Sequence, residues 1–238
     1  MRSFLISLGL LFGTLLTIAQ TEVVKINNFH IVYIYGPFKV NFIKSKAEKV
    51  EIDYNGINPE EVVIKSKDGE LSIKLRNRSF FNLGNNAHWE GRNNRYARVT
   101  IHYIDVEAIE ARAGAIIRAS ETIVSKQLFL VSKMGADMRL DINTKKLELD
   151  SSMGSEVDLT GVAETVDIRS KMGSNVDASF LQSQYVTVSS SMGSEVSVLA
   201  EKELNASADF GASITYKGNP PMKHTSKFLG AEVYPRKK

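Results

Sequence analysis

Two aspartates set 19 residues apart are the first candidates for chemistry in this chain. Asp158 and Asp177 occupy the same position in two similar stretches, SSMGSEVDL (151–159) and SKMGSNVDA (170–178). If these stretches stack as neighbouring parallel strands, the two Cα atoms lie about 4.8 Å apart. The carboxyl groups would then have a separation near that of a retaining glycosidase, or they could share a calcium ion.

The residues around this acidic ladder favour a sheet-stabilising role over catalysis. Glu156 and Asn175 form a second ladder two residues earlier, and Arg139 occupies the position of Asp158 one repeat before it. Alternating charges along a ladder are what strand pairing alone favours. The sequence also lacks a nucleophile elbow, a P-loop, a dinucleotide fingerprint and a His-Glu-x-x-His motif. We therefore expect no catalytic residue, no metal site and no cofactor, with calcium at the acidic ladder as an open alternative.

A segment rich in aromatic and amide side chains, residues 77–96, supplies the second set of candidates. It reads NRSFFNLGNNAHWEGRNNRY and contains the single tryptophan, Trp89. Trp89 and Tyr96 could stack on sugars while Arg92 forms hydrogen bonds, which makes all three candidate ligand-binding residues. The segment is longer than most connections in a compact domain. We favour the simpler interpretation that it folds back as a lid, since large apolar side chains usually cover something.

Glycines in matching contexts reveal the elements that would position these candidates. Successive glycines are separated by 18 to 21 residues. They are Gly114, Gly135, Gly154, Gly173, Gly193, Gly211 and Gly230. Apolar and polar residues alternate before them, as in LELDSSM, and after them, as in SEVDL, which predicts half-buried strands on both sides of a glycine corner. The residue just before each glycine, most often Met, is expected to fill the interior of the bend.

The repeat predicts an all-β protein, a right-handed parallel β-helix with rungs of about 19 residues. No repeat shows the 3.6-residue period of a helix, and parallel crossovers are right-handed by default. Each corner needs a residue without a Cβ atom. Serines three places before four of the glycines share the phase of the inward apolar residues, which predicts a buried hydroxyl ladder of Ser132, Ser151, Ser170 and Ser190. The repeated motif is therefore interpreted as a structural joint rather than as a binding site.

The recurring SxMGSxVxL rungs resemble the head GIN domain family, whose members are described as putative auto-transporter adhesins and are common in Bacteroidetes. The opening FHIVYIYGPFKVNFIKSKAEKVEIDY, the strand DGELSIKL (68–75) and the ending ITYKGNPP (214–221) with FLGAEV (228–233) are similar to the family as well. The resemblance covers about residues 28–235. It implies an adhesive role and supplies no catalytic motif to carry onto this chain.

The N-terminus has the features of a secretory signal peptide over residues 1–19. A basic start, MRS, precedes the apolar run FLISLGLLFGTLLTI and two small residues at the cleavage point. We expect export through the general secretory route to the periplasm, the outer cell surface or the medium, with no transmembrane segment after cleavage. The mature chain then comprises an N-terminal β region, 20–100, with the capping loop 77–96, and regular rungs, 101–238, as one continuous domain.

Charge and cysteine content narrow the classes of partner. The 30 basic and 27 acidic residues are mixed along the chain and leave a formal net charge of +3. This balance does not favour nucleic acid as a partner. The chain has no cysteine, so an exported form would depend on its core rather than on disulfides.

These features predict an exported, non-enzymatic binding module, an adhesin or a cell-envelope protein. Its stacked polar ladders would contact a carbohydrate or an envelope protein through many weak interactions. Two alternatives stay open: a polysaccharide-active hydrolase or lyase that uses the acidic ladder, and a structural envelope module. A groove lined by stacked acids and bases would favour the enzyme, and a flat polar face would favour the binding module.

Overall fold

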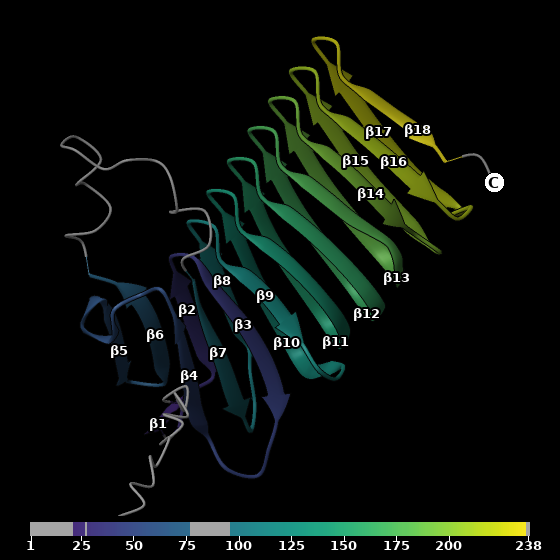
Figure 1. Ribbon diagram of the computed structural model, residues 1–238. Helices are drawn as coiled ribbons and strands as arrows, with labels where there is room; N and C mark the ends of the chain where they lie inside the picture. Colours follow the sequence, from purple (N-terminus) through teal and green to yellow (C-terminus); the bar gives the residue numbers. More distant parts are fainter. Residues whose placement is uncertain (1–20, 27, 77–95, 237–238) are drawn as a thin grey trace, which may run out of the picture.

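The repeat forms a parallel β-helix in which each strand pairs with the equivalent strand of the next rung (Figure 1). The computed structural model describes residues 21–26, 28–76 and 96–236. Leu147 lies opposite Val166, and Met138 lies opposite Val157, so the rungs stack at an offset of 19 residues. The predicted all-β solenoid with corners at the glycines is thereby confirmed.

Three long strands run from one glycine corner to the next, and shorter strands form the rungs on either side. The long strands are β11 (Asp137–Ser152), β12 (Glu156–Lys171) and β13 (Asn175–Ser191). The shorter ones are β8 (Ala108–Arg112), β9 (Ile116–Ala119), β10 (Ile123–Lys133), β14 (Glu195–Leu199), β15 (Glu203–Asp209), β16 (Ser213–Lys217), β17 (Met222–Phe228) and β18 (Glu232–Pro235).

The coil has two faces and two edges, which we name by their place relative to the corners. The entry face consists of the segments that lead into the corners: 108–112, 128–133, 147–152, 166–171, 186–191, 204–209 and 223–228. The exit face consists of the segments that leave them: 116–119, 137–142, 156–161, 175–181, 195–199, 213–217 and 232–235. The glycines lie along the corner edge. The far edge, on the opposite side, consists of 120–127, 143–146, 162–165, 182–185 and 200–203.

Parallel rungs extend back into the N-terminal region, in an order that differs from the order of the chain. Strands β2 (Ile31–Tyr35) and β3 (Phe38–Lys44) form one rung, and β6 (Glu70–Leu75) and β7 (Tyr96–Tyr103) form another. Strand β2 pairs in parallel with both β6 and β8, and β3 with both β7 and β9. The β2–β3 rung therefore lies between the β6–β7 rung and the regular coil.

Antiparallel strands cover the N-terminal end of the coil. These elements are β1 (Thr21–Lys25), β4 (Lys49–Asn55), the 3-10 turn η1 (Pro59–Glu61) and β5 (Val62–Lys67). Strand β4 pairs with β7 and β1, and β5 pairs with β6. These strands cover the edges of β6 and β7, while β1 and β5 each pair with one strand only in the described part of the chain and form the new edges of the sheet. The N-terminal region thus contributes both coil rungs and antiparallel strands, while the division of the chain at residue 100 stays a prediction.

Each glycine corner is a turn with two consecutive residues of positive φ. At one corner Met153 has φ 59° and Gly154 has φ 67°, and the other corners repeat this pair of values closely. Positive φ at both central residues is the signature of a type I′ turn. A Cβ atom on Gly154 would meet nothing within 4 Å, so the glycine is required by its φ and not by crowding.

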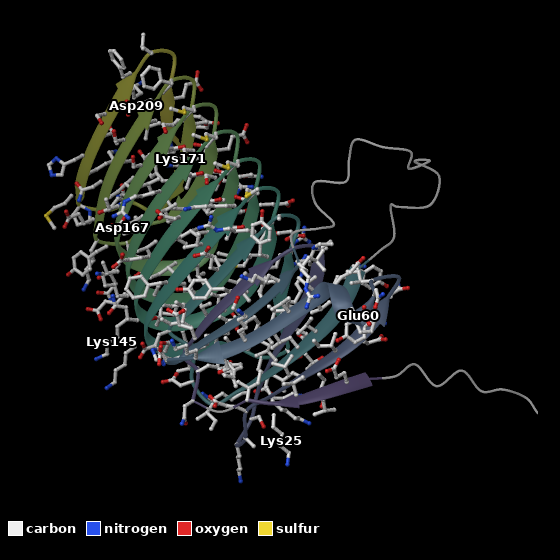
Figure 2. All side chains as sticks on the ribbon, turned by 90° about the vertical axis from the view of Figure 1, so that its left-hand side faces the viewer. Lys25, Glu60, Lys145, Asp167, Lys171 and Asp209 are labelled. Carbon is white, nitrogen blue, oxygen red and sulfur yellow. The ribbon has the colours of Figure 1, made fainter. Side chains whose placement is uncertain are left out.

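The expectation that the residue before each glycine fills the bend is wrong. Met153 is 50% exposed, and the equivalent Met134, Met172 and Met192 are 41%, 43% and 53% exposed. A left-handed residue at the first turn position directs its side chain to the outside of the coil. A row of sulfur atoms consequently follows the corner edge (Figure 2).

Serine hydroxyls fill the inside of the bend. Ser132, Ser151, Ser170 and Ser190 are at most 2% exposed, which confirms the predicted ladder. A second ladder, not predicted, consists of Ser155, Ser174 and Ser194 directly after the glycines. The Ser151 and Ser155 hydroxyls lie 2.9 Å apart, and the Ser155 Oγ donates to the Ser132 carbonyl of the preceding rung at 2.8 Å. These bonds satisfy polar groups that burial would otherwise leave unpaired.

Aliphatic ladders occupy the rest of the interior and end at a polar C-terminal rung. Leu128, Leu147, Val166, Val186 and Leu204 stack in register with almost no exposure. In β17, the last strand of the entry face, the inward columns continue with Lys223, Thr225 and Lys227. All three residues are exposed. Charged side chains at inward positions of a terminal strand discourage end-to-end stacking with another coil.

Alanine substitutions at two glycines should distinguish the loss of stability caused by a positive φ from the loss caused by a steric clash. Gly154→Ala introduces no clash and should lower the free energy of unfolding by about 1–2 kcal/mol, the cost of a left-handed residue. Gly161 has φ 104°, and a Cβ there would lie 2.1 Å from the Ile142 carbonyl oxygen. Gly161→Ala should therefore cost more than about 3 kcal/mol in urea unfolding. Equal losses at the two sites would contradict this description.

The serine ladder should respond to removal of a single hydroxyl. Ser174 Oγ accepts from the Lys171 N–H at 3.2 Å and donates to the Ser151 carbonyl at 3.1 Å. Ser174→Ala leaves these buried groups unpaired and should destabilise the chain by about 1–3 kcal/mol. The exposed Ser189 is the matched control, and Ser189→Ala should change stability by less than about 0.5 kcal/mol.

Candidate binding surfaces

The acidic ladder predicted from sequence lies in register on the exit face. Asp158 is paired with Asp177, and Glu156 with Asn175, across β12 and β13. Directly after this pair, a β-bulge shifts the register of β12 against β13 between Asp158 and Thr160. The structure therefore brings together these four predicted residues on two adjacent rungs.

Arginine side chains form ion pairs with most carboxylates of this acidic ladder. Arg139 lies 3.0 Å from Asp158, 3.4 Å from Glu156 and 3.5 Å from Asp137. The fourth carboxylate, Asp177, accepts a hydrogen bond from the Ser179 backbone N–H at 2.9 Å. Within the described residues, no group of three or more His, Asp or Glu side chains is arranged to hold a metal ion. Arg118 also pairs with Asp137 at 2.8 Å, so two arginines face four carboxylates and this part of the exit face keeps a net negative charge.

The aromatic candidates are only partly placed. Trp89 and Arg92 lie outside the described residues. Tyr96, at the start of β7, has Lys39 Nζ 3.7 Å from its ring centroid and accepts a hydrogen bond from Arg98 at 3.1 Å. Hydrogen bonding with Asn55 and the nearby Arg98 and Lys39 charges lower the pKa of the Tyr96 hydroxyl.

Tyr96 does not join the acidic ladder. It projects from the same side of the coil, but the strands β3, β9 and β11 separate β7 from β12. Four rung steps correspond to roughly 19 Å at about 4.8 Å each. A compact site that combines Tyr96 with Asp158 is therefore ruled out, and only an extended ligand could touch both.

A concave groove runs along the far edge, and it was not predicted from the sequence. Its volume is about 600 Å³. Amide groups come from Asn143, Gln182 and Gln184, and exposed apolar surface from Val124 and Val162. The Thr144 and Ser183 hydroxyls are buried and donate to the Lys146 and Leu181 carbonyls. Charged side chains at its rim are Asp105, Lys126, Lys145, Glu164 and Glu201. Figure 2 shows Lys145 extending from this edge, well away from Lys171 beside the corners.

The groove repeats with the rungs, because its side chains occupy equivalent positions on successive turns. Val124, Asn143, Val162 and Gln182 form one column in register. The next outward column reads Lys126, Lys145, Glu164 and Gln184, in which Glu164 is the one carboxylate. Within this column no two carboxylates stack directly on each other, and the other two carboxylates of the groove are Asp105 and Glu201. Polar residues that recur eight to eleven places after each glycine were the sequence signal for this groove.

These observations define a class of protein: a parallel β-helix with ordered polar surfaces and an acidic ladder that is partly paired with arginine. The chain matches the family model described as putative auto-transporter adhesin, head GIN domain, over residues 28–220. It belongs to that family. The resemblance inferred from the repeated rungs is thereby confirmed.

Solved structures share the fold at low sequence identity. A putative adhesin from Bacteroides fragilis is 18% identical, with a TM-score of 0.75, over 91% of this chain and 96% of that one. A protein from Parabacteroides distasonis described as a putative lipid binding protein is 14% identical, with a TM-score of 0.68, over 92% and 96%. A putative adhesin from Parabacteroides merdae is 14% identical, with a TM-score of 0.61, over 92% and 96%. No curated protein matches the sequence.

None of the helical structure in the described part of the chain is long and apolar enough to cross a bilayer.

Replacing Arg139 should leave the carboxylates of the acidic ladder without their ion-pair partner. Arg139 is about half exposed, so Arg139→Gln should cost about 1 kcal/mol or less, and less at high salt. The variant leaves Glu156, Asp158 and Asp177 without an arginine partner, while Asp137 stays paired with Arg118 at 2.8 Å, so calcium should raise its melting temperature more than that of the unaltered chain. If calcium raised both equally, the ladder would already be a cation site despite Arg139.

Proposed function

We propose that the chain is an exported, non-enzymatic binding module that holds an extended carbohydrate in the far-edge groove. The observation that carries the proposal is the groove itself, where amide and apolar side chains recur on consecutive rungs. Membership of a family described as adhesins supports a binding role. Export rests on the predicted signal peptide and on the same family description.

The chemistry of the groove suits a neutral or weakly charged sugar chain. Amide side chains both donate and accept hydrogen bonds, as sugar hydroxyls do, and Asn143 and Gln182 present such groups on alternate rungs. Between them, Val162 is 47% exposed and offers an apolar surface for the ring faces. Mixed charges at the rim, such as Lys145 beside Glu164, give no strong preference for either sign of ligand.

A repeating surface binds a repeating ligand through the sum of weak contacts. The rungs hold the groove residues on paired strands, so little conformational entropy is lost on binding. The contacts on successive rungs then act within one molecule, which raises avidity without any strong single contact. An enzyme is the less favoured alternative, because the paired carboxylates Asp158 and Asp177 lie on a flat face beside Arg139 and not in the groove.

A glycan array tests the proposal with the chain from residue 20 to 238, with and without calcium. We expect saturable binding that falls at least about tenfold in the Asn143→Ala, Gln182→Ala double variant, since buried polar sugar groups lose their partners. Asn175→Ala, an amide on the exit face, is the matched control and should bind as before.

Each other outcome rejects a defined part of the proposal. Binding that survives the groove variant but is lost with Asp158→Asn and Asp177→Asn would move the binding surface to the exit face. An absence of binding to every glycan would exclude the carbohydrate ligand. Release of shortened sugars would make the chain an enzyme.

A further inference from the structure

A second, smaller pocket lies on the entry face beside the corner edge. Its volume is about 260 Å³, and it spans four successive rungs. The side chains that matter for its chemistry are Lys133, Ser152, Arg169, Lys171, Ser189 and Ser191. We call it the Ser152 pocket. It lies across the coil from the far-edge groove, so it does not depend on the function proposed above.

The hydroxyl of Ser152 is buried without a partner. The residue is 1% exposed, and its Oγ has no hydrogen bond in the described part of the chain. Every serine of the two corner ladders, in contrast, is paired with a hydroxyl or a backbone group, as Ser170 is with Ser174 at 2.8 Å. A buried, unpaired hydroxyl is uncommon in a folded protein and indicates a missing partner.

Two lysines flank this hydroxyl on the neighbouring rungs. Lys133 pairs with Ser152 across β10 and β11, and Lys171 pairs with Ser152 across β11 and β12. The three side chains therefore project from the same column, about 4.8 Å apart from one rung to the next. No carboxylate among the described residues lies within ion-pair distance of either lysine. Their two positive charges are thus available to a ligand.

The remaining charges in the pocket are paired. Arg169 lies 3.0 Å from Asp167 and 3.7 Å from Asp150, so its guanidinium is held between two carboxylates. Asp150 also lines the pocket and contributes a negative charge, which Arg169 offsets. Above Lys171 in the same column lies Ser191, whose hydroxyl has no hydrogen bond in the described residues. The pocket therefore combines a net positive charge with hydroxyl donors.

We propose that the Ser152 pocket binds a tetrahedral oxyanion, a phosphate or sulfate group carried by a ligand. The Ser152 hydroxyl would donate to one oxygen, and the Lys133 and Lys171 ammonium groups would approach others from the two sides. Bonds from ammonium groups to an anion are charge-assisted and are the stronger class of hydrogen bond. The group can come from a lipid head group or from a water-soluble ester, and both present the same oxygens.

The first test uses inorganic phosphate and sulfate as probes in an NMR titration of the full mature chain. We expect saturable shifts of the Lys133, Ser152, Lys171 and Ser191 amides that chloride at equal ionic strength does not produce. The Lys133→Gln, Lys171→Gln double variant should bind at least about tenfold more weakly, because it loses both charge-assisted bonds. The control is Lys126→Gln, Lys145→Gln, which removes the same charge at the far edge and should bind as before.

The Ser152→Ala variant tests whether the anion contacts the Ser152 hydroxyl or is held by the lysine charges alone. It keeps all charges, so a weaker affinity for phosphate in this variant supports the hydroxyl contact. Shifts that spread over all lysines, or an equal loss in both double variants, would mean non-specific screening and would overturn the proposal. Thermal melts of each variant confirm that the coil is intact.

A second test distinguishes the two sources of the anion. Vesicles of phosphatidylcholine with phosphatidic acid should retain the chain in a flotation assay if the group belongs to a lipid, and pure phosphatidylcholine should not. A sulfated or phosphorylated monosaccharide should instead compete with inorganic phosphate if the ester is water-soluble. In either case binding must depend on Lys133 and Lys171. Retention that survives the loss of both lysines contradicts the site.

Discussion

Two consecutive residues of positive φ at every corner are the constraint on which the rest of the structure depends. They reverse the chain direction in a tight two-residue turn, so the strands before and after the glycine belong to opposite faces. The Gly154 N–H donates to the Met172 carbonyl of the next corner at 3.1 Å, and the same bond recurs from corner to corner. Because the corners stack on one another, every other position along the rung stacks as well.

This register divides the residues into those that fold the coil and those that remain available for binding. Inside the bend, hydroxyls such as Ser155 satisfy the backbone of the neighbouring rung, and aliphatic ladders fill the interior. Outside, each column presents a chosen sequence of charges, amides or hydroxyls at a fixed spacing. On the exit face Arg139 pairs with three carboxylates, whereas the Ser152 pocket leaves two lysines without a carboxylate partner. The surfaces proposed for binding lie where polar or charged side chains in a column have no partner in the neighbouring rungs.

The sequence predicts the rungs better than it predicts their surfaces. The spacing of the glycines and the alternation around them were sufficient to place β10 to β18 and to bring Asp158 opposite Asp177. The orientation of Met153 was predicted wrongly, because alternation assigns side chains to the inside or the outside only while φ stays negative. The place of the β2–β3 rung between β6–β7 and β8–β9 could not be predicted, since pairing between distant segments leaves no periodic signal. The far-edge groove was not predicted, because the glycine spacing defines the corners and does not show that the polar residues of the opposite turns line a concave surface.

The central claim is that the repeated SxMGSxVxL stretches are structural joints. The most direct measurement is the free energy of unfolding of a chain in which Met134, Met153, Met172 and Met192 are all replaced by Asn. Asparagine tolerates a left-handed φ, and the methionine side chains are about half exposed, so the account predicts a gain of about 1–2 kcal/mol with an unchanged β-sheet spectrum. A loss of stability by a similar amount would mean that the methionines pack rather than mark turns, and would contradict the account.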